Sequence, residues 1–317
     1  MKKLPILAAL LLFAGAADAQ LALQNPTAPV GSGKTISPSF SKILTQDGPN
    51  DETTAIDRSY ETAQKKYSQD SYISQTGTDH YAIVDQTDTR ANKSGDTGSS
   101  AYISQSKSEN DAFQTQVLNE TSSGTGRNRL EAIQSGKENE SRQSQIGGYN
   151  NKASVEQSHF ASGPSSSGTN NRALQTQTGG HGNSAGIIQQ GTNSYAKQTQ
   201  EGHGNDATIA QGSPGTKNTA IQVQGASSSG NVAQIRQSAY GESASKSYAK
   251  QSQNGLNDQA DIFQESNGNF AQQDQSGGLG QDSILYNNTS SIHQQNVASA
   301  AYTRQQGNSN TAIVYQH

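Results

Sequence analysis

The sequence predicts an all-β fold, a parallel two-sheet β-solenoid of roughly nine or ten strand–turn–strand rungs of about 22 residues each. The first reason is a repeat, Asn-x-Ala-x-(Ile or Gln)-x-Gln, which recurs about every 11 residues and some nineteen times between residue 69 and residue 317. The second reason is that glycine and proline avoid the repeat. A short period of this kind is typical of solenoids, in which successive strands stack on one another.

The repeated residues lie on one face of each predicted strand. Counted backward from the last Gln at position 0, Asn stands at −6, Ala at −4 and Ile or Gln at −2, as in Asn205, Ala207, Ile209 and Gln211. Side chains two residues apart point to the same side of a strand, so these four are predicted to face the interior. The side chains expected to form a stacked structural ladder are Asn183, Gln189, Gln200, Asn205, Ala207, Ile209, Gln211, Asn231, Gln237, Gln264, Asn269 and Gln275.

The ends of the repeats define nineteen strands of seven residues. Of the 32 glycines, only Gly186 lies inside these strands, and Pro164 and Pro214 lie between them. Both residue types interrupt strands, so their exclusion supports the assignment. The predicted strands end at Gln75, Gln86, Gln105, Gln116, Gln134, Gln145, Gln157, Gln177, Gln189, Gln200, Gln211, Gln224, Gln237, Gln253, Gln264, Gln275, Asn288, Gln305 and Gln316.

Position −2 alternates between an apolar residue and Gln from Ile103 to Gln273. The structural unit is therefore two strands, one with an apolar interior residue and one lined by amides. Stacked units would form two parallel sheets about 10 Å apart, with rungs about 4.8 Å apart. Gln would lie over Gln and Asn over Asn, so we expect each buried side-chain amide to bond to its copies above and below.

The composition excludes several classes of function. Only 29% of the residues are hydrophobic and 15% are charged, with no Cys, so neither a large globular core nor disulfides are expected. The formal net charge of −4 offers no basic surface for nucleic acid. His181 and His203 occupy equivalent turns, but two imidazoles alone make a poor metal site. The carboxylates are scattered, so we expect no enzyme activity, no cofactor and no metal.

The chain divides into three predicted segments. Residues 1–19 have the form of a secretory signal peptide, with Lys2 and Lys3, an apolar run from Leu4 to Gly15 and a small-residue cleavage site. This run is shorter than the roughly 20 residues of a membrane-spanning helix, so no membrane insertion is expected. Residues 20–64 form a Pro-rich leader that is expected to be flexible, and residues 65–317 form the repeat domain. The protein is therefore expected to be exported.

The repeat, written Gln-x-Gly-x-x-Asn-x-Ala-x-x-x-Gln, resembles the curlin repeat of bacterial curli fibre subunits. The match covers residues 69 to 317 and is fullest at 75–86, 134–145, 189–200, 200–211, 253–264, 264–275 and 305–316. The resemblance implies a secreted functional amyloid of the biofilm matrix, which passes the periplasm and an outer-membrane curli-type secretion pore and polymerises at the cell surface with a nucleator subunit. The residues do not distinguish a major subunit, a nucleator and a longer third type.

The last repeat is predicted to be a polymerising edge made of Asn310, Ala312, Val314 and Gln316. An uncovered strand offers its backbone N–H and C=O groups to another strand, so we expect this edge to add the first strands of a second copy and build a homopolymer fibre. The alternative is a monomeric secreted β-solenoid adhesin, whose flat outer face binds a surface or a glycan.

Overall fold

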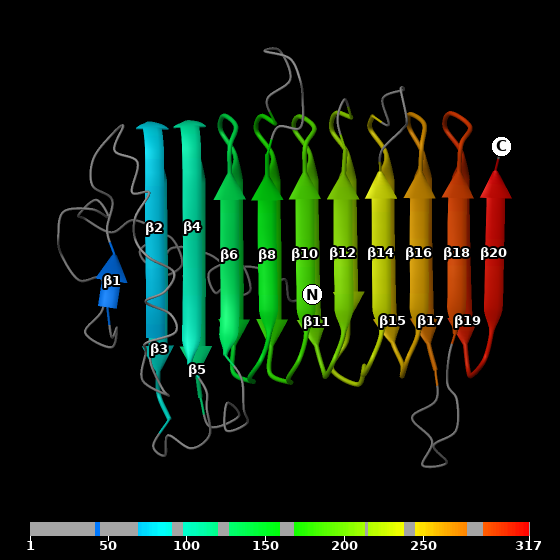
Figure 1. Cartoon of the computed structure of the whole chain (residues 1–317). Helices are drawn as coiled ribbons and strands as arrows, with labels where there is room; N and C mark the ends of the chain where they lie inside the picture. The colour runs from blue at the N-terminus through cyan, green and yellow to red at the C-terminus, as the bar shows by residue number, and fades with distance from the viewer. Residues whose placement is uncertain are drawn as a thin grey trace, which may run out of the picture.

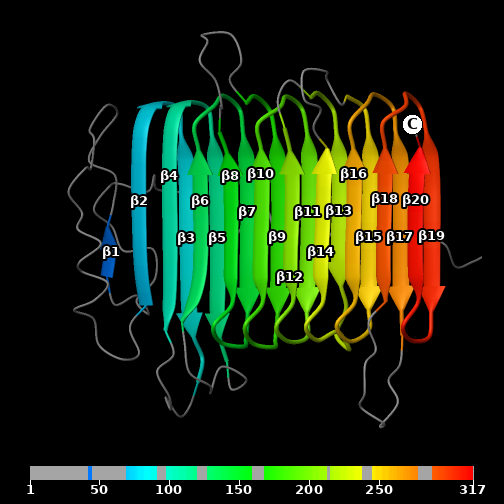
Figure 2. The same cartoon turned by 45° about the vertical axis from the view of Figure 1, so that its right-hand side comes forward.

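The computed structural model describes residues 42–44, 69–90, 98–119, 127–158, 168–212, 215–237, 245–277 and 288–316. These residues form an all-β structure of two facing parallel sheets, which confirms the predicted β-solenoid (Figures 1 and 2). No helix among them is long and apolar enough to cross a bilayer. The predicted signal segment and leader lie outside the described residues, except for a short strand at Lys42–Leu44.

One sheet has eleven strands and the other has nine. In order, the eleven-stranded sheet contains β1 Lys42–Leu44, β2 Gln69–Thr78, β4 Ser99–Ser108, β6 Asn128–Gln134, β8 Lys152–Gln157, β10 Ser184–Gln189, β12 Asp206–Gln211, β14 Val232–Gln237, β16 Gln259–Gln264, β18 Thr289–Gln294 and β20 Thr311–Gln316. The nine-stranded sheet contains β3 Tyr81–Asp88, β5 Asp111–Leu118, β7 Glu140–Ile146, β9 Arg172–Thr178, β11 Tyr195–Glu201, β13 Thr219–Gln224, β15 Tyr248–Asn254, β17 Phe270–Ser276 and β19 Ala300–Gln306.

From β2 onward, consecutive strands alternate between the two sheets, and each strand pairs with the equivalent strand of the next rung. The register places identical repeat positions side by side, for example Ala185 beside Ala207 and Gln189 beside Gln211 in β10 and β12. A rung is thus one strand of each sheet. The strands β2 to β19 make nine rungs and β20 begins a tenth, in agreement with the predicted number.

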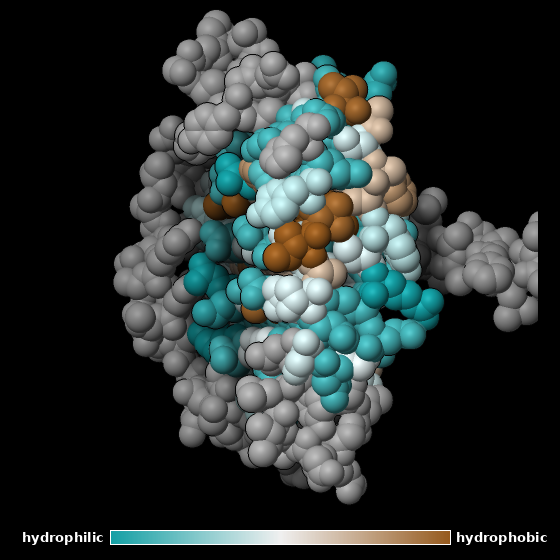
Figure 3. Space-filling view, turned by 90° about the vertical axis from the view of Figure 1, so that its right-hand side faces the viewer, coloured by the Kyte–Doolittle hydropathy of each residue, from teal (hydrophilic) through white to brown (hydrophobic). Residues whose placement is uncertain are grey.

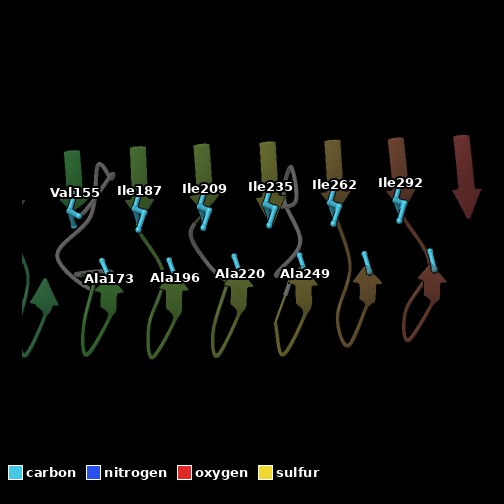
Figure 4. Packing of buried hydrophobic residues seen from close by; sticks show 12 residues of the cluster. Val155, Ala173, Ile187, Ala196, Ile209, Ala220, Ile235, Ala249, Ile262 and Ile292 are labelled. Carbon is cyan, nitrogen blue, oxygen red and sulfur yellow. The ribbon is translucent and has the colours of Figure 1, made fainter. Parts of the chain in front are cut away.

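The core between the sheets is thin. Isoleucine or valine at −2 of the eleven-stranded sheet packs against alanine at −4 of the nine-stranded sheet, as Ile187 and Ile209 do against Ala196 and Ala220 (Figure 4). Ile209 and Ala196 are fully buried. Each fully buried isoleucine contributes roughly 2–3 kcal/mol to stability. Alanine leaves space for the facing isoleucine, so the two sheets pack closely with little apolar material.

One predicted strand is wrong. The sequence spacing predicts a strand that ends at Asn288, but this residue is the −6 residue of β18, which runs from Thr289 to Gln294. Its backbone N–H donates to the side-chain Oδ1 of Asp258, the −6 residue of the preceding rung, at 3.1 Å. The sequence pattern is weak here because Ser290 replaces the alanine at −4. The structure fixes the assignment because Ile292 and Gln294 stack on Ile262 and Gln264.

The turns bring backbones of neighbouring rungs into close contact. Gly202 has φ +84°, and a Cβ atom built on it would lie 2.1 Å from the carbonyl oxygen of Ser228 in the next rung. Gly186 is different, because it lies inside β10 and its nearest neighbour would be the Ser154 hydroxyl at 3.8 Å. Glycine is thus required sterically at the first position and not at the second.

We predict that Gly202→Ala destabilises the fold by about 3 kcal/mol or more, because the methyl group would push apart two stacked backbones. Gly186→Ala serves as the matched control, and it should be neutral or stabilise by about 0.5–1 kcal/mol, since extended glycine loses more entropy on folding than alanine. Denaturant unfolding followed by circular dichroism measures both. Equal effects of the two substitutions would contradict the close stacking of the turns.

A second feature of the turns is a left-handed residue immediately before position −6. Asn150, Asn193 and Asn257 fill it with φ near +55°, but Ala298 also does so at φ +56°. Asparagine and glycine tolerate this conformation better than alanine. Ala298 therefore holds a strained backbone in the turn between β18 and β19.

We predict opposite effects for one substitution at two nearby alanines. Ala298→Gly should stabilise the protein by roughly 0.5–1 kcal/mol, because glycine relieves the left-handed strain. Ala300→Gly in the extended strand β19 should destabilise it by about the same amount, because glycine costs more conformational entropy there. The midpoints of denaturant unfolding give the sign of each effect, and two destabilised variants would contradict the assigned turn conformation.

Candidate assembly interface

Three columns of stacked glutamine run through the interior. The first ladder occupies position 0 of the eleven-stranded sheet, and its members are Gln75, Gln105, Gln134, Gln157, Gln189, Gln211, Gln237, Gln264, Gln294 and Gln316. The second occupies position 0 of the nine-stranded sheet, with Gln86, Gln116, Gln145, Gln177, Gln200, Gln224, Gln253, Gln275 and Gln305. The third occupies position −2 of that sheet, with Gln114, Gln143, Gln175, Gln198, Gln222, Gln251 and Gln273.

All three ladders have the same direction. In each, the Nε2 group of one glutamine donates to the Oε1 atom of the glutamine in the next rung toward β20. Gln189 donates in this way to Gln211 at 2.9 Å, and Gln211 donates to Gln237 at 2.9 Å. The spacing of rungs in a parallel sheet, about 4.8 Å, is what allows one amide to reach the next. The side-chain dipoles are therefore aligned along the stack.

The second N–H of these amides ties the two sheets together. Gln198 in β11 donates to the backbone carbonyl oxygens of Gly186 and Ala207 in the opposite sheet, at 2.8 and 3.0 Å. Gln211 in β12 donates to the carbonyl oxygen of Tyr195 in β11 at 3.1 Å. Buried amides are costly unless they are hydrogen-bonded, and here most donors have partners. The amides thus act between sheets as well as between rungs.

The asparagines at −6 stack as expected, but the expected bonding between their side chains is wrong for the interior rungs. The Oδ1 atom of Asn183 accepts from the backbone N–H of Asn205 at 3.0 Å, and its Nδ2 group donates to the carbonyl oxygen of Gly202 at 2.9 Å. Asn205 binds Asn231 in the same way, at 3.1 Å. The shorter side chain of asparagine reaches the neighbouring backbone rather than the neighbouring amide. Asn therefore fixes the turns, and Gln fixes the strands.

The predicted ladder residues all lie in the stack. Ala207 and Ile209 belong to the buried core of β12. Asn269 is buried immediately before β17, and its Oδ1 atom accepts from the backbone N–H of Ser299 at 3.0 Å. Asn231 is buried too, but its Nδ2 group has no hydrogen-bond partner among the described residues. Asn183 and Asn205 hold the turns as described above. The remaining members are all Gln, and they occupy the first and second ladders.

The predicted polymerising edge is the outermost strand of the eleven-stranded sheet. β20 pairs with β18 on one side, and no described strand pairs with its other side. Ala312, Val314 and Gln316 face the interior as their equivalents do, but they are only half-buried, and Val314 packs on the core. Figure 3 views this end directly and shows apolar patches near its middle among polar residues.

Hydrogen-bond donors point outward from this end. The Gln316 Nε2 group donates to the Ala300 carbonyl oxygen at 2.9 Å, and no described residue takes its second N–H. In each inner rung, the backbone N–H at −5 donates to the carbonyl oxygen at −6 of the next rung, as Thr289 does to Asn310 at 2.8 Å. The equivalent N–H on β20 belongs to Thr311 and faces the open side. The edge thus repeats the inner pattern without a partner.

Asp258 shows what the stack requires at position −6. It replaces asparagine and is 1% exposed, and its Oδ2 atom has no hydrogen-bond partner among the described residues. Burial raises the pKa of this carboxyl group above its ordinary value, although its bonds to Asn288 act in the opposite direction. At position −6 the Nδ2 group of Asn183 donates to the carbonyl oxygen of Gly202 in the turn. The ionised carboxylate of Asp258 at the same position has no N–H group to donate. Its carboxylate is therefore destabilising at neutral pH.

The two turn histidines singled out by the sequence lie side by side in the structure. The His181 and His203 rings stack on adjacent rungs with centroids 4.5 Å apart, but no described group of three or more His, Cys, Asp or Glu side chains could hold a metal. Tyr149 stacks on His181 at 4.8 Å. This column fits a role in packing the turns.

We predict that Asp258→Asn stabilises the protein by about 1–2 kcal/mol near neutral pH, because it removes a buried carboxylate and restores a donor. Since the folded-state pKa of Asp258 is raised, wild type regains stability as the pH falls through that pKa toward the ordinary value of about 4. The advantage of the variant should therefore shrink with acidification. Urea unfolding midpoints of wild type and variant, measured near pH 7 and near pH 4, test this. Asp206→Asn is the control at an exposed carboxylate, and its midpoint should change little. A variant no more stable than wild type near pH 7 would refute it.

No protein-family model and no curated protein matches this chain. The function must therefore be inferred from the geometry of the stack and of its end.

Proposed function

We propose that this chain is the structural subunit of an extracellular, curli-like functional amyloid fibre that self-assembles by edge-to-edge stacking of solenoids. The observation that carries the proposal is that β20 has the interior pattern of an inner strand yet has one unpaired side among the described residues. A second copy would supply a partner strand on the open side of β20, as each inner strand already has on both sides. The role is structural, with no catalytic step.

The end of the stack supports the proposal in three ways. Val314 packs on the apolar core beside the half-buried Ala312, the Gln316 amide extends the first ladder, and Thr311 presents a forward backbone N–H. Unpaired strand edges of this kind pair with other chains unless they are blocked by proline, charge or a bulge. β20 has none of these features.

The resemblance to the curlin repeat supplies the biological setting of the proposal. The fibre would be secreted through the periplasm and an outer-membrane curli-type pore, would start from a nucleator subunit and would serve in the biofilm matrix and in surface adhesion. The Gln ladders support it, because stacked amides are a recurrent element of cross-β fibres. In the alternative, a monomeric β-solenoid adhesin, the same stack presents a flat outer face and does not polymerise.

The decisive variant is Thr311→Pro. Proline has no N–H and is excluded from paired central strands, but the Thr311 N–H faces the open side and has no partner among the described residues. We predict that the purified wild-type chain forms thioflavin-positive fibres at micromolar concentration, and that the elongation rate of Thr311→Pro falls by about tenfold or more, since its edge cannot complete the backbone ladder. Unfolding of the monomer should be unchanged.

The matched control is Thr311→Val, which keeps the N–H and the shape of the side chain and should elongate like wild type. If wild type stays monomeric under these conditions, the fibre proposal fails and the adhesin is favoured. If wild type forms fibres and Thr311→Pro elongates as fast as Thr311→Val, growth does not use the edge of β20.

A further inference from the structure

We propose a defined joint between copies: β20 of one copy pairs with β2 of the next, and β19 pairs with β3, both in the unshifted register of the inner rungs. This inference rests on the proposed function and specifies its partner surface. The joint would be head to tail, with the β20 end of one copy against the β2 end of the next. Four features of the two ends support it.

The first feature is the direction of the glutamine ladders. Every ladder bond donates toward β20, so the β20 end presents amide donors, from Gln316 in one sheet and Gln305 in the other. In the proposed register, these groups approach the Oε1 atoms of Gln75 and Gln86 of the next copy, as Gln294 approaches Gln316 within the chain at 2.8 Å. Two β20 ends facing each other would oppose donor to donor.

The second feature is that the third ladder stops one rung short of each end. Val84 precedes its first member, Gln114, and Thr303 follows its last member, Gln273. The Thr303 hydroxyl already pairs with the Ser290 hydroxyl at 2.7 Å and needs no amide from the next rung. The joint would therefore place Thr303 beside Val84, two β-branched side chains of similar volume. It would leave the Oε1 atom of Gln114 as it is within the chain, buried and without a hydrogen-bond partner among the described residues.

The third feature is the match of the outer faces. β19 carries Arg304 beside Asp274 of β17, and the same register places Arg304 beside Asp85 of the next copy. Tyr302 is 55% exposed at −3 of β19, where the next copy would bring Ile83. On the other sheet, Ile313 is 61% exposed and would meet Tyr72, which stacks on Tyr102 with ring centroids 5.1 Å apart. The charged and the exposed apolar side chains on the outer face of the β20 end would thus both meet complementary side chains of the next copy.

The fourth feature is the strand that covers part of the receiving edge. β1 pairs with β2 through three residue pairs, from Lys42 to Leu44, whereas β18 and β20 show that a full partner in this sheet forms six. An incoming β20 would therefore replace a shorter strand with a longer one. The β3 edge has no partner strand among the described residues, but Ile83, Val84 and Gln86 are already buried within the single chain. β19 would therefore pair there only once this end is uncovered.

Charge reversal on the two sides of the joint tests both its polarity and its register. Asp85→Arg places a second arginine beside Arg304 of the neighbouring copy, and Arg304→Glu places a second carboxylate beside Asp85. Each variant alone should elongate from its own seeds about 3- to 10-fold more slowly than wild type at low salt, and the defect should diminish as salt screens the charges. Asp206→Arg in the middle of the stack is the matched control and should elongate like wild type.

The informative sample is an equimolar mixture of Asp85→Arg and Arg304→Glu. In a head-to-tail joint, the new arginine of one variant meets the new glutamate of the other, and the alternate joints pair Arg304 with Asp85 as in wild type. The mixture should therefore elongate at close to the wild-type rate. Two results would contradict the joint while leaving the fibre proposal intact. One is a mixture that elongates as slowly as the separate variants. The other is an Asp85→Arg variant that elongates as fast as wild type. If wild type forms no fibres, both inferences fail.

Discussion

The unshifted register between rungs is the constraint on which the rest of the structure depends. A glutamine ladder holds only when glutamine lies directly beside glutamine, as Gln189 lies beside Gln211. A slip of two residues would set these amides against isoleucine or beyond the end of the strand, and each buried amide without a partner costs about 1–3 kcal/mol. A slip of one residue would turn the interior face outward. Because a slip would impose this cost at every rung, the same register is favoured along the whole stack.

This constraint explains how a chain with few apolar residues forms an ordered interior. The hydrophobic contribution comes from single isoleucine or valine residues on one sheet and alanines on the other, such as Ile209 and Ala220. Most of the remaining interior is polar, and it is buried at low cost because the amides bond to each other and to backbone carbonyls. Composition alone would suggest disorder, but the spacing of the residues indicates order.

The sequence was sufficient for the fold because the period of two along strands and the 22-residue repeat each leave one consistent arrangement. The alternation at −2 correctly separated the isoleucine sheet from the glutamine sheet. It could not reveal how asparagine bonds, since that depends on the reach of a short side chain at a turn. It also misplaced β18, where Ser290 interrupts the pattern, because the compensating hydroxyl of Thr303 lies in the other sheet. Such pairs are visible only once the two sheets face each other.

The common direction of the ladders has an electrical consequence. Backbone dipoles largely cancel within a β-sheet. The side-chain amides of Gln189, Gln211 and Gln237 do not cancel, because each donates the same way as the last. Like the peptide groups of an α-helix, they add to a dipole along the stack axis, with its positive end at β20. A fibre of such units would be a polar rod, and two rods lying side by side at low ionic strength would be more stable pointing in opposite directions.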